Sequence, residues 1–293
     1  MNKALLSMLD RYEPKTLADH ENALKEIVQE LALLGLWRAK FYEHAAFYGG
    51  TALRIFHNLP RFSEDIDFSL MQPDSDFDLE PHLEAVRAEL AAFGFSFRVE
   101  RKTKRTDTSI ESAFIKGETR MNLLHIGTPD YLRDRLPRPQ QIRIKLEVDT
   151  DPPPLASYEV KTLLTPIPFQ VRLFNLPSLF AGKLHALLCR NWRRRVKGRD
   201  FYDFVWYLGR KASCDLRHLQ ARMEQTGHWK GSRNLDACEL RELLKKRFEQ
   251  IDFVQAKNDV RPFIRDEAEL QLWDHDFFES LADRIAESGT EDG

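Results

Sequence analysis

The sequence has few cysteines and no long apolar run. Its three cysteines, Cys189, Cys214 and Cys238, are too few and too unevenly spaced for a disulfide framework or a CxxC zinc knuckle, so we expect reduced thiols. The longest apolar stretch, residues 31–37, is far shorter than the roughly 20 residues that cross a bilayer, and we expect no membrane association. Segment 1–15 lacks the apolar block of a secretory signal, which favours a cytoplasmic protein.

The sequence also lacks an excess of charge of one sign. It has 44 basic and 46 acidic residues and a formal net charge of −2, which argues against a protein that coats nucleic acid with its whole surface. A local basic patch remains compatible with this balance. A hydrophobic fraction of 42% over 293 residues is enough for one large or two medium folded domains, so general disorder is excluded.

Hydrophobic periodicity predicts a mixed α and β N-terminal part. Apolar residues recur at helical spacing from residue 14 to 34 and again over 81–93. Segments 65–70 and 141–149 alternate strictly between apolar and polar residues, which predicts half-buried strands. Shorter strands are expected at 45–48, 96–100, 112–115 and 121–126.

Three consecutive prolines, 152–154, end the second alternating segment because proline cannot continue a sheet ladder. Beyond them we expect no further strand. Helical periods occur at 178–195, 200–211, 216–224, 236–250 and 267–286. The pattern predicts two domains, a mixed one over 1–160 and a mainly helical one over 161–293.

A glycine turn and a pair of acids form the first candidate site. Gly49 and Gly50 let backbone amides approach a phosphate, and a helix beginning at Thr51 presents free N–H groups and a hydroxyl to it. Asp65 and Asp67 are two residues apart on a strand, so both carboxylates project from one face and can hold Mg²⁺. The third carboxylate of a two-metal site would come from the second alternating strand, from Glu147 or alternatively from Asp149.

Each of these motifs alone is more often structural. A Gly-Gly-Thr sequence is commonly a turn, and an Asp-x-Asp sequence on an alternating strand is commonly a solvated face. Their combination is more specific, because the glycine turn opens a helix and the following strand carries both acids. No GxxxxGK[ST] sequence occurs, so the phosphate chemistry is not that of a P-loop protein.

The second candidate site is a basic segment followed by two aspartates. Seven basic residues and no acid lie between positions 183 and 199, namely Lys183, Arg190, Arg193, Arg194, Arg195, Lys197 and Arg199. Asp200, Asp203 and Tyr207 follow at helical spacing along the edge of an apolar stripe. The structural alternatives are helix capping by Asp200 and a solvated helix surface for the arginines.

The residues of both sites resemble a known family. Segments 47–54 (FYGGTALR) and 59–68 (LPRFSEDIDF) resemble the signature of the AbiEii/AbiGii nucleotidyltransferase toxins, members of the polymerase-β-like nucleotidyltransferase superfamily that are related to the MenT toxins. That family also has a helical lysine followed by an R-D-x-x-D-like motif, which recurs here as Lys183 and segment 199–203. The resemblance covers residues 40–210 and implies an α+β fold, with a polymerase-β-like catalytic domain followed by a helical one.

The resemblance implies a Mg²⁺-dependent enzyme, or one that uses Mn²⁺, which transfers a nucleoside monophosphate from an NTP to an acceptor and releases pyrophosphate. By this likeness Asp65, Asp67 and Glu147 hold metal, and Lys183 contacts the triphosphate. The triphosphate would also be gripped by Gly49, Gly50 and Thr51. Asp200 or Asp203 would orient groups at the site.

Likeness to the MenT toxins suggests the 3′ end of a tRNA as acceptor, with protein hydroxyls as an alternative. The RNA surface would be formed by Arg190, Arg193, Arg194, Arg195 and Lys197. A toxin role would require a cognate AbiEi-like antitoxin. The competing interpretation is a catalytically inactive module that uses the same fold to bind nucleotide, RNA or a partner.

Overall fold

The computed structural model describes residues 3–102, 108–135, 141–191, 195–230 and 233–287. The chain divides into two compact units that are interleaved along the sequence, whereas the sequence predicted the contiguous domains 1–160 and 161–293. The first unit comprises Met1–Ala52, Glu64–Pro152 and Val160–Leu173. The second unit comprises Leu53–Ser63, Pro153–Glu159 and Phe174–Gly293.

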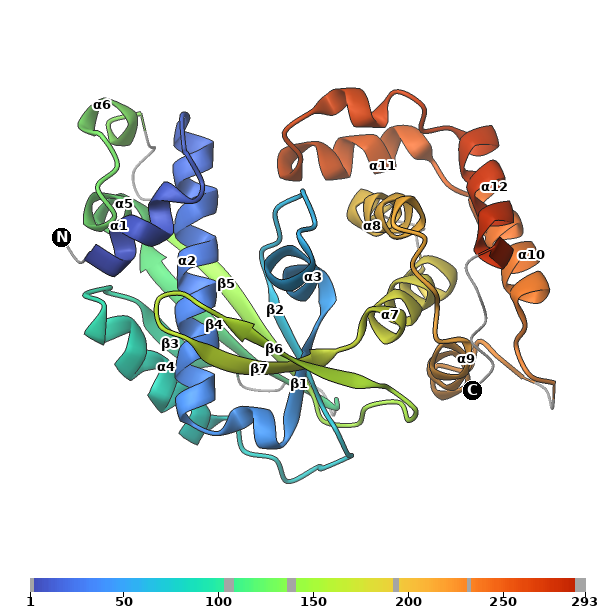
Figure 1. The fold of residues 1–293 in the computed structure, drawn as a ribbon, viewed down its shortest axis with the longest axis horizontal. Helices are drawn as coiled ribbons and strands as arrows, with labels where there is room; N and C mark the ends of the chain where they lie inside the picture. The colour runs from blue at the N-terminus through green and yellow to red at the C-terminus, as the bar shows by residue number, and fades with distance from the viewer. Residues whose placement is uncertain (1–2, 103–107, 136–140, 192–194, 231–232, 288–293) are drawn as a thin grey trace. The chain divides into compact units, whose positions relative to one another are not determined.

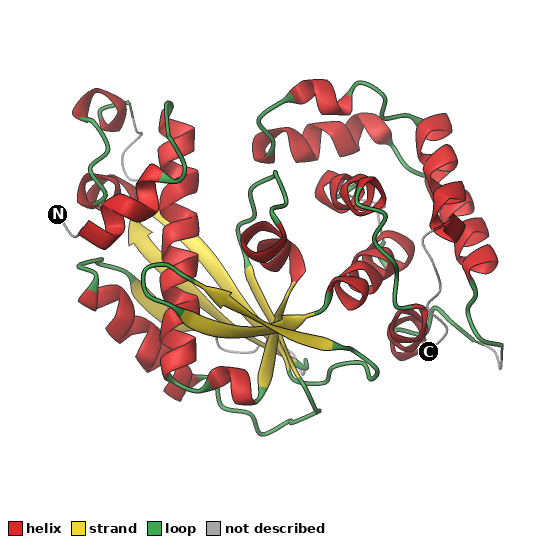
Figure 2. Cartoon of the chain, viewed as in Figure 1, coloured by secondary structure: helices red, strands yellow, loops and turns green. Residues whose placement is uncertain are grey.

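The first unit is built on a mixed sheet of seven strands in the order β3-β4-β5-β2-β1-β7-β6 (Figures 1 and 2). The strands are β1 (Ala45–Tyr48), β2 (Ile66–Leu70), β3 (Arg98–Arg101), β4 (Ile110–Glu118), β5 (Gln141–Asp149), β6 (Tyr158–Leu163) and β7 (Phe169–Phe174). Strand β2 is antiparallel to β1 and parallel to β5, while β7 is parallel to β1. The mixed sheet confirms the predicted fold class.

Helices pack against this sheet. The helices of the first unit are α1 (Lys3–Asp10), α2 (Leu17–Arg38), α4 (Glu80–Ala92), α5 (Thr119–His125) and α6 (Asp130–Arg133). Of these, α2, α4 and α5 contact strands of the sheet. Helix α2 begins at a capping box in which Thr16 and Asp19 satisfy each other's backbone N–H groups, and it lies across the sheet (Figure 1). A Cβ added at Gly35 would be 2.8 Å from the Cα of Val86, so glycine permits the close packing of α2 on α4.

Two sequence predictions in this unit are wrong. Segment 121–126, expected as a strand, belongs to helix α5 and the turn after it: Leu123 is buried, whereas Met121 and Leu124 are 57% and 48% exposed. A short apolar run is compatible with a helix or a strand. Here the segment forms a helix that buries one side only. The second error concerns the region after the prolines, where β6 and β7 continue the sheet with alternating burial along β7.

The second unit is helical. Its helices are α7 (Leu176–Cys189), α8 (Gly198–Gly209), α9 (Leu216–Gln225), α10 (Ala237–Phe248), α11 (Phe253–Val260) and α12 (His275–Asp283). Helix α3 (Gly49–His57) begins in the first unit and ends in the second. Phenylalanine rings form the core, with Phe201 and Phe278 packed edge to face at 5.5 Å. The helix expected over 267–286 is interrupted, because Asp274 caps a new helix at His275.

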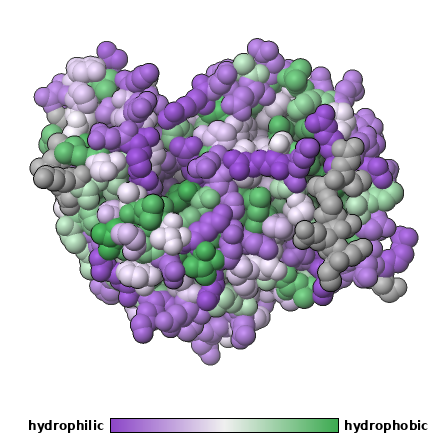
Figure 3. All heavy atoms as spheres, in the orientation of Figure 1, coloured by the Kyte–Doolittle hydropathy of each residue, from purple (hydrophilic) through white to green (hydrophobic). Residues whose placement is uncertain are grey.

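On the face drawn in Figure 3, hydrophilic side chains predominate and apolar ones form small patches. Within the residues that the structure describes, no helix is both long enough and apolar enough to span a membrane.

Candidate active site

The glycine turn lies directly against one of the two predicted acids. Strand β1 ends at Tyr48, and helix α3 follows at once through Gly49, whose φ is +83°. A Cβ added at Gly49 would lie 2.6 Å from Oδ2 of Asp67. Pairing of Tyr48 with Asp67 across β1 and β2 explains this closeness. The carboxylate of Asp67 therefore lies beside the N-terminus of α3.

The side chain of Thr51 has a different place from the one that the sequence predicted. Thr51 is fully buried, and its hydroxyl donates a short hydrogen bond to the carbonyl oxygen of Asp65. The hydroxyl thus links helix α3 to Asp65, the residue that precedes β2. The sequence had predicted that this hydroxyl would donate to a phosphate.

The register of the sheet places Glu147, and not Asp149, beside Asp67. In the parallel pair of β2 and β5, Asp67 is opposite Glu147, while Asp149 is opposite Ser69. Glu147 accepts a hydrogen bond from the Ser112 hydroxyl at 3.2 Å and forms an ion pair with Lys145 at 2.6 Å. Among the two alternatives drawn from the sequence, the geometry favours Glu147.

The donor chemistry of these carboxylates suits a hard divalent cation. Carboxylate oxygens from adjacent strands are the ligands that Mg²⁺ uses, together with phosphate oxygens of a substrate. Within the described residues, however, no three His, Cys, Asp or Glu side chains converge closely enough to hold an ion. The ammonium group of Lys145 lies 2.6 Å from Oε1 of Glu147.

In the second unit, Lys183 lies between the two predicted aspartates. Its Nζ is 3.0 Å from Oδ1 of Asp200 and 2.7 Å from Oδ2 of Asp203. Helix α8 begins at Gly198 after Lys197, so Asp200 is not its N-cap, and neither carboxylate lies at a solvated edge. Both are buried, with Asp203 fully so. The structural alternative of helix capping is thereby excluded.

Charge balance keeps Asp200 ionised in spite of its burial. Burial alone would raise its pKa, but the ammonium of Lys183 and the guanidinium of Arg190 outweigh burial and lower the pKa below its ordinary value. Arg190 also forms a short ion pair with Asp200. At neutral pH the carboxylate of Asp200 is therefore ionised.

Sequence reasoning missed Arg61, which completes this cluster. Its Nε and Nη2 each lie 2.6 Å from an oxygen of Asp203 in a bidentate pair, and the side chain is 2% exposed. Burial lowers the pKa of Arg61, but Asp203 more than compensates and the pKa is raised. Arg61 stands within segment 59–68, so the only available signal was its place in that signature, 142 positions before Asp203.

The predicted RNA-binding residues are only partly described. Arg193 and Arg194 lie outside the described residues. Arg190 contacts Asp200, and Arg195 pairs with Asp259 at 2.6 Å. Burial, followed by the charge of Arg190, lowers the pKa of Lys197. An RNA-binding role for this segment stays a prediction.

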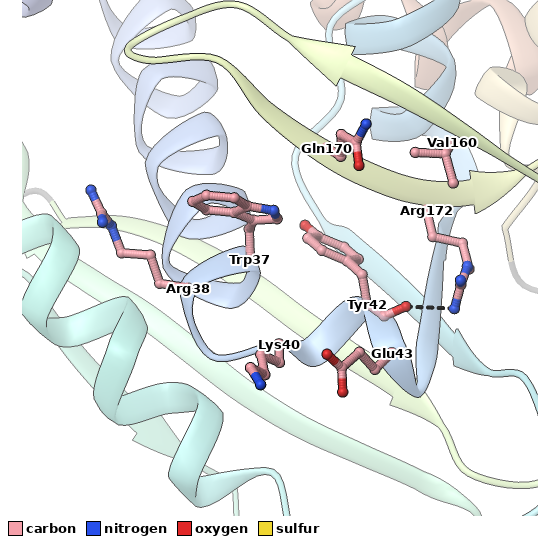
Figure 4. A pocket seen from close by; sticks show the side chains of 8 residues that line it. All are labelled: Trp37, Arg38, Lys40, Tyr42, Glu43, Val160, Gln170 and Arg172. Atoms are coloured by element: carbon pink, nitrogen blue, oxygen red, sulfur yellow. Dashed lines mark hydrogen bonds between the residues drawn. The ribbon is translucent and has the colours of Figure 1, made fainter.

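Two pockets of the first unit are lined by different parts of the chain. A pocket of about 380 Å³ adjoins Asp65 and is lined by Asp65, Lys102, Phe114, Arg143 and Lys145. A larger pocket, of about 550 Å³, is lined by residues that precede β1, among them Trp37 and Tyr42, and by residues of β6 and β7 (Figure 4). There Arg172 donates a 2.7 Å hydrogen bond to the carbonyl of Tyr42. Only the smaller pocket touches a predicted catalytic residue.

Comparison with known proteins gives one family and two similar structures. The family described as nucleotidyl transferase AbiEii toxin, type IV TA system, matches residues 31–282. Two crystal structures from Helicobacter pylori, a protein assigned as a nucleotidyltransferase and JHP933, are each 17% identical with a TM-score of 0.50. Each alignment covers 90% of this chain, and 93% and 90% of the respective structures. At this identity they show a shared fold. No curated protein matches the chain.

Proposed function

Because the chain belongs to the AbiEii family of nucleotidyl transferase toxins, we propose that it transfers a nucleoside monophosphate from an NTP to the 3′ end of a tRNA. The family confirms the predicted enzyme class, and its type IV toxin–antitoxin setting implies an antitoxin partner. The observation that carries the proposal is the position of Asp67, held between the glycine turn and Glu147. A carboxylate beside a helix N-terminus combines the two elements that phosphoryl transfer needs.

The first unit supplies the nucleotide site in this proposal. The backbone N–H groups at the start of α3, at Gly49 and Gly50, bind phosphate oxygens of the NTP. Asp65, Asp67 and Glu147 would hold Mg²⁺ or Mn²⁺, which when bound neutralises charge on the phosphates. Thr51 contributes through its buried hydrogen bond, which positions the backbone of Asp65.

In the same proposal, Lys183 contacts the triphosphate of the NTP. Asp200 and Asp203 hold its ammonium group from two sides, and Arg61 holds Asp203 in turn. The two aspartates and Arg61 thus act as positioning residues for one cation. A preorganised cation stabilises charge that develops during transfer without having to reorient.

The basic residues support an RNA acceptor, and the toxin–antitoxin setting of the family supports an antitoxin partner. Phosphates of a tRNA would pair with Arg190, Arg193, Arg194, Arg195 and Lys197. Each neutralised phosphate adds affinity that falls as salt rises. The antitoxin would be an AbiEi-like protein, and the site of action would be the cytoplasm, where tRNA is charged.

The experiment is incubation of purified protein with Mg²⁺, α-³²P-labelled NTPs and total RNA, followed by sequencing of tRNA 3′ ends. We expect label on tRNA with the natural protein and none with Asp65→Ala. Asp76→Ala, which removes an exposed loop carboxylate of the same unit, should label as the natural protein does. Label on protein instead of RNA, or equal labelling by Asp65→Ala, would contradict the proposal.

A further inference from the structure

One face of the sheet in the first unit changes from basic to acidic along β5. Arg143, Lys145 and Glu147 alternate with buried residues, so the three side chains share this face. The register with β4 places Phe114 opposite Lys145. The register with β2 places Asp67 opposite Glu147. A basic and aromatic area therefore borders directly on the proposed catalytic carboxylates.

The pocket of about 380 Å³ lies at this border. Its lining combines the carboxylate of Asp65 with three cations, Lys102, Arg143 and Lys145, and one aromatic ring. The guanidinium of Arg143 stacks over the ring of Phe114 at 3.7 Å from the ring centre. Cations bind phosphates, and both an aromatic ring and a guanidinium plane are surfaces on which unpaired bases stack.

The order of the strands indicates which of the two substrates, the NTP or the acceptor, binds in this pocket. Strand β2 lies between β1 and β5, so the carboxylates of Asp65 and Asp67 separate the glycine turn after β1 from the pocket on β4 and β5. In an in-line displacement the attacking and leaving oxygens are on opposite sides of the phosphorus. If pyrophosphate leaves on the side of the glycine turn, the acceptor approaches from the side of the pocket.

We propose that this pocket binds the terminal nucleotides of a single-stranded RNA acceptor. Arg143 and Lys102 contact its phosphates, and a terminal base stacks on the face formed by Phe114 and Arg143. The inference rests on the proposed function. The acceptor hydroxyl oxygen forms a bond to the α phosphorus while the bond from that phosphorus to the β-bridging oxygen breaks. Pyrophosphate leaves with the bonding electron pair, and the hydroxyl proton passes to solvent.

The test measures RNA binding and transfer separately. Fluorescence anisotropy with a labelled single-stranded RNA ending in CCA reports binding without any need for transfer. We expect Arg143→Ala and Phe114→Leu each to weaken this binding about tenfold, the size expected for one stacked base or one phosphate contact. The slope of log affinity against log salt should fall by about 0.7 in Arg143→Ala, as for one phosphate on a single strand. Arg143→Lys should retain that slope.

The matched control is Arg98→Ala. This residue lies on edge strand β3 with a side chain 73% exposed, and it does not line the pocket. Its removal should leave RNA affinity within about twofold, in line with an exposed charge that does not line the pocket. All variants should retain the thermal unfolding temperature of the natural protein and its affinity for NTP in calorimetry.

Three outcomes would overturn the inference. RNA affinity that is unchanged in both Arg143→Ala and Phe114→Leu would do so, and so would a loss of NTP affinity, which would make the pocket a nucleotide subsite. Transfer to protein rather than RNA would be the third. The proposed function fails separately, when the natural protein binds the RNA but transfers no label to it.

Discussion

The carboxylate of Asp67 fills the space that a side chain at Gly49 would need. An added Cβ would lie 2.6 Å from Oδ2 of Asp67, and the glycine also has a φ of +83°. Two requirements therefore coincide at one position: a backbone conformation that L residues avoid and the absence of a Cβ. Through this contact the glycine turn and the acidic strand, which are separate motifs in the sequence, become parts of one site.

Gly49→Ala should inactivate the enzyme while leaving it folded. The left-handed backbone costs about 1–2 kcal/mol with a Cβ, and the contact displaces Asp67. Displacement of a catalytic group by about 1 Å can lower the rate about 10²-fold. The measurements are transfer of labelled nucleotide and the free energy of unfolding in urea.

Two glycines of the second unit serve as controls that distinguish the effect of backbone strain from the effect of the contact with Asp67. Gly227 has a φ of +73° and no atom within 4 Å of an added Cβ, so Gly227→Ala should cost about 1–2 kcal/mol of stability without affecting transfer. Gly182 has neither constraint, and Gly182→Ala within α7 should stabilise by about 0.5–1 kcal/mol. Full activity in Gly49→Ala would show that the contact with Asp67 has no catalytic importance.

Glu147→Gln should lower the transfer rate far more than Asp149→Asn. The register places Glu147 opposite Asp67, whereas Asp149 is opposite Ser69. Loss of one charged group that stabilises the transition state typically lowers kcat about 10²–10³-fold. Asp149→Asn is the matched control on the same face of the same strand. Equal losses in both variants, measured at saturating NTP and Mg²⁺, would contradict the assignment of Glu147.

Arg61→Ala should destabilise the second unit by about 3–5 kcal/mol, because it leaves a buried carboxylate without its bidentate partner. Asp203, fully buried, would then keep its ion pair with Lys183 but lose both hydrogen bonds from the guanidinium. The exposed pair of Arg233 and Glu239, at 3.5 Å, is the control: Arg233→Ala should change stability by less than about 1 kcal/mol. Urea unfolding checks both values. A cost below 1 kcal/mol for Arg61→Ala would show that solvent readily replaces the guanidinium.

The strands that carry the acids could be predicted because their sequences alternate between apolar and polar residues. Segments 45–48 and 141–149 are strands with the expected bounds, and segment 65–70 differs by one residue. Alternation is a local pattern, so it predicts a shared face for Asp65 and Asp67 without any knowledge of their surroundings. That shared face stays a prediction, because Asp65 precedes β2. The family resemblance is confirmed, and with it the enzyme class.

The contacts that define the site could not be predicted in this way, because they join distant parts of the chain. Arg61 meets Asp203 across 142 positions, and nothing in the local pattern of either segment specifies the other. The choice between Glu147 and Asp149 depended on strand register, which shifts without any change in alternation when a strand slips by two residues. The place of the Thr51 hydroxyl could not be predicted either. Its hydrogen-bond partner is the carbonyl oxygen of Asp65, 14 positions later in the chain.

His185 should make the protein less stable as the pH falls from about 6.5, the ordinary histidine pKa. Burial, followed by the charge of Arg222, lowers the pKa of His185 to about 3. The folded protein therefore keeps this imidazole neutral, hydrogen-bonded to Thr226 at 2.9 Å, while the unfolded chain takes up a proton. Since the unfolded state binds more protons, the free energy of unfolding falls by at most about 1.4 kcal/mol per pH unit.

This loss begins below about pH 6.5 and ends near the folded pKa, because both states are protonated beneath it. Urea unfolding at pH 7, 6 and 5 measures the slope, and His185→Gln should reduce it. If His185→Gln retained the full dependence of the free energy of unfolding on pH, the proton would be taken up by another group on unfolding. The prediction for His185 would then be wrong.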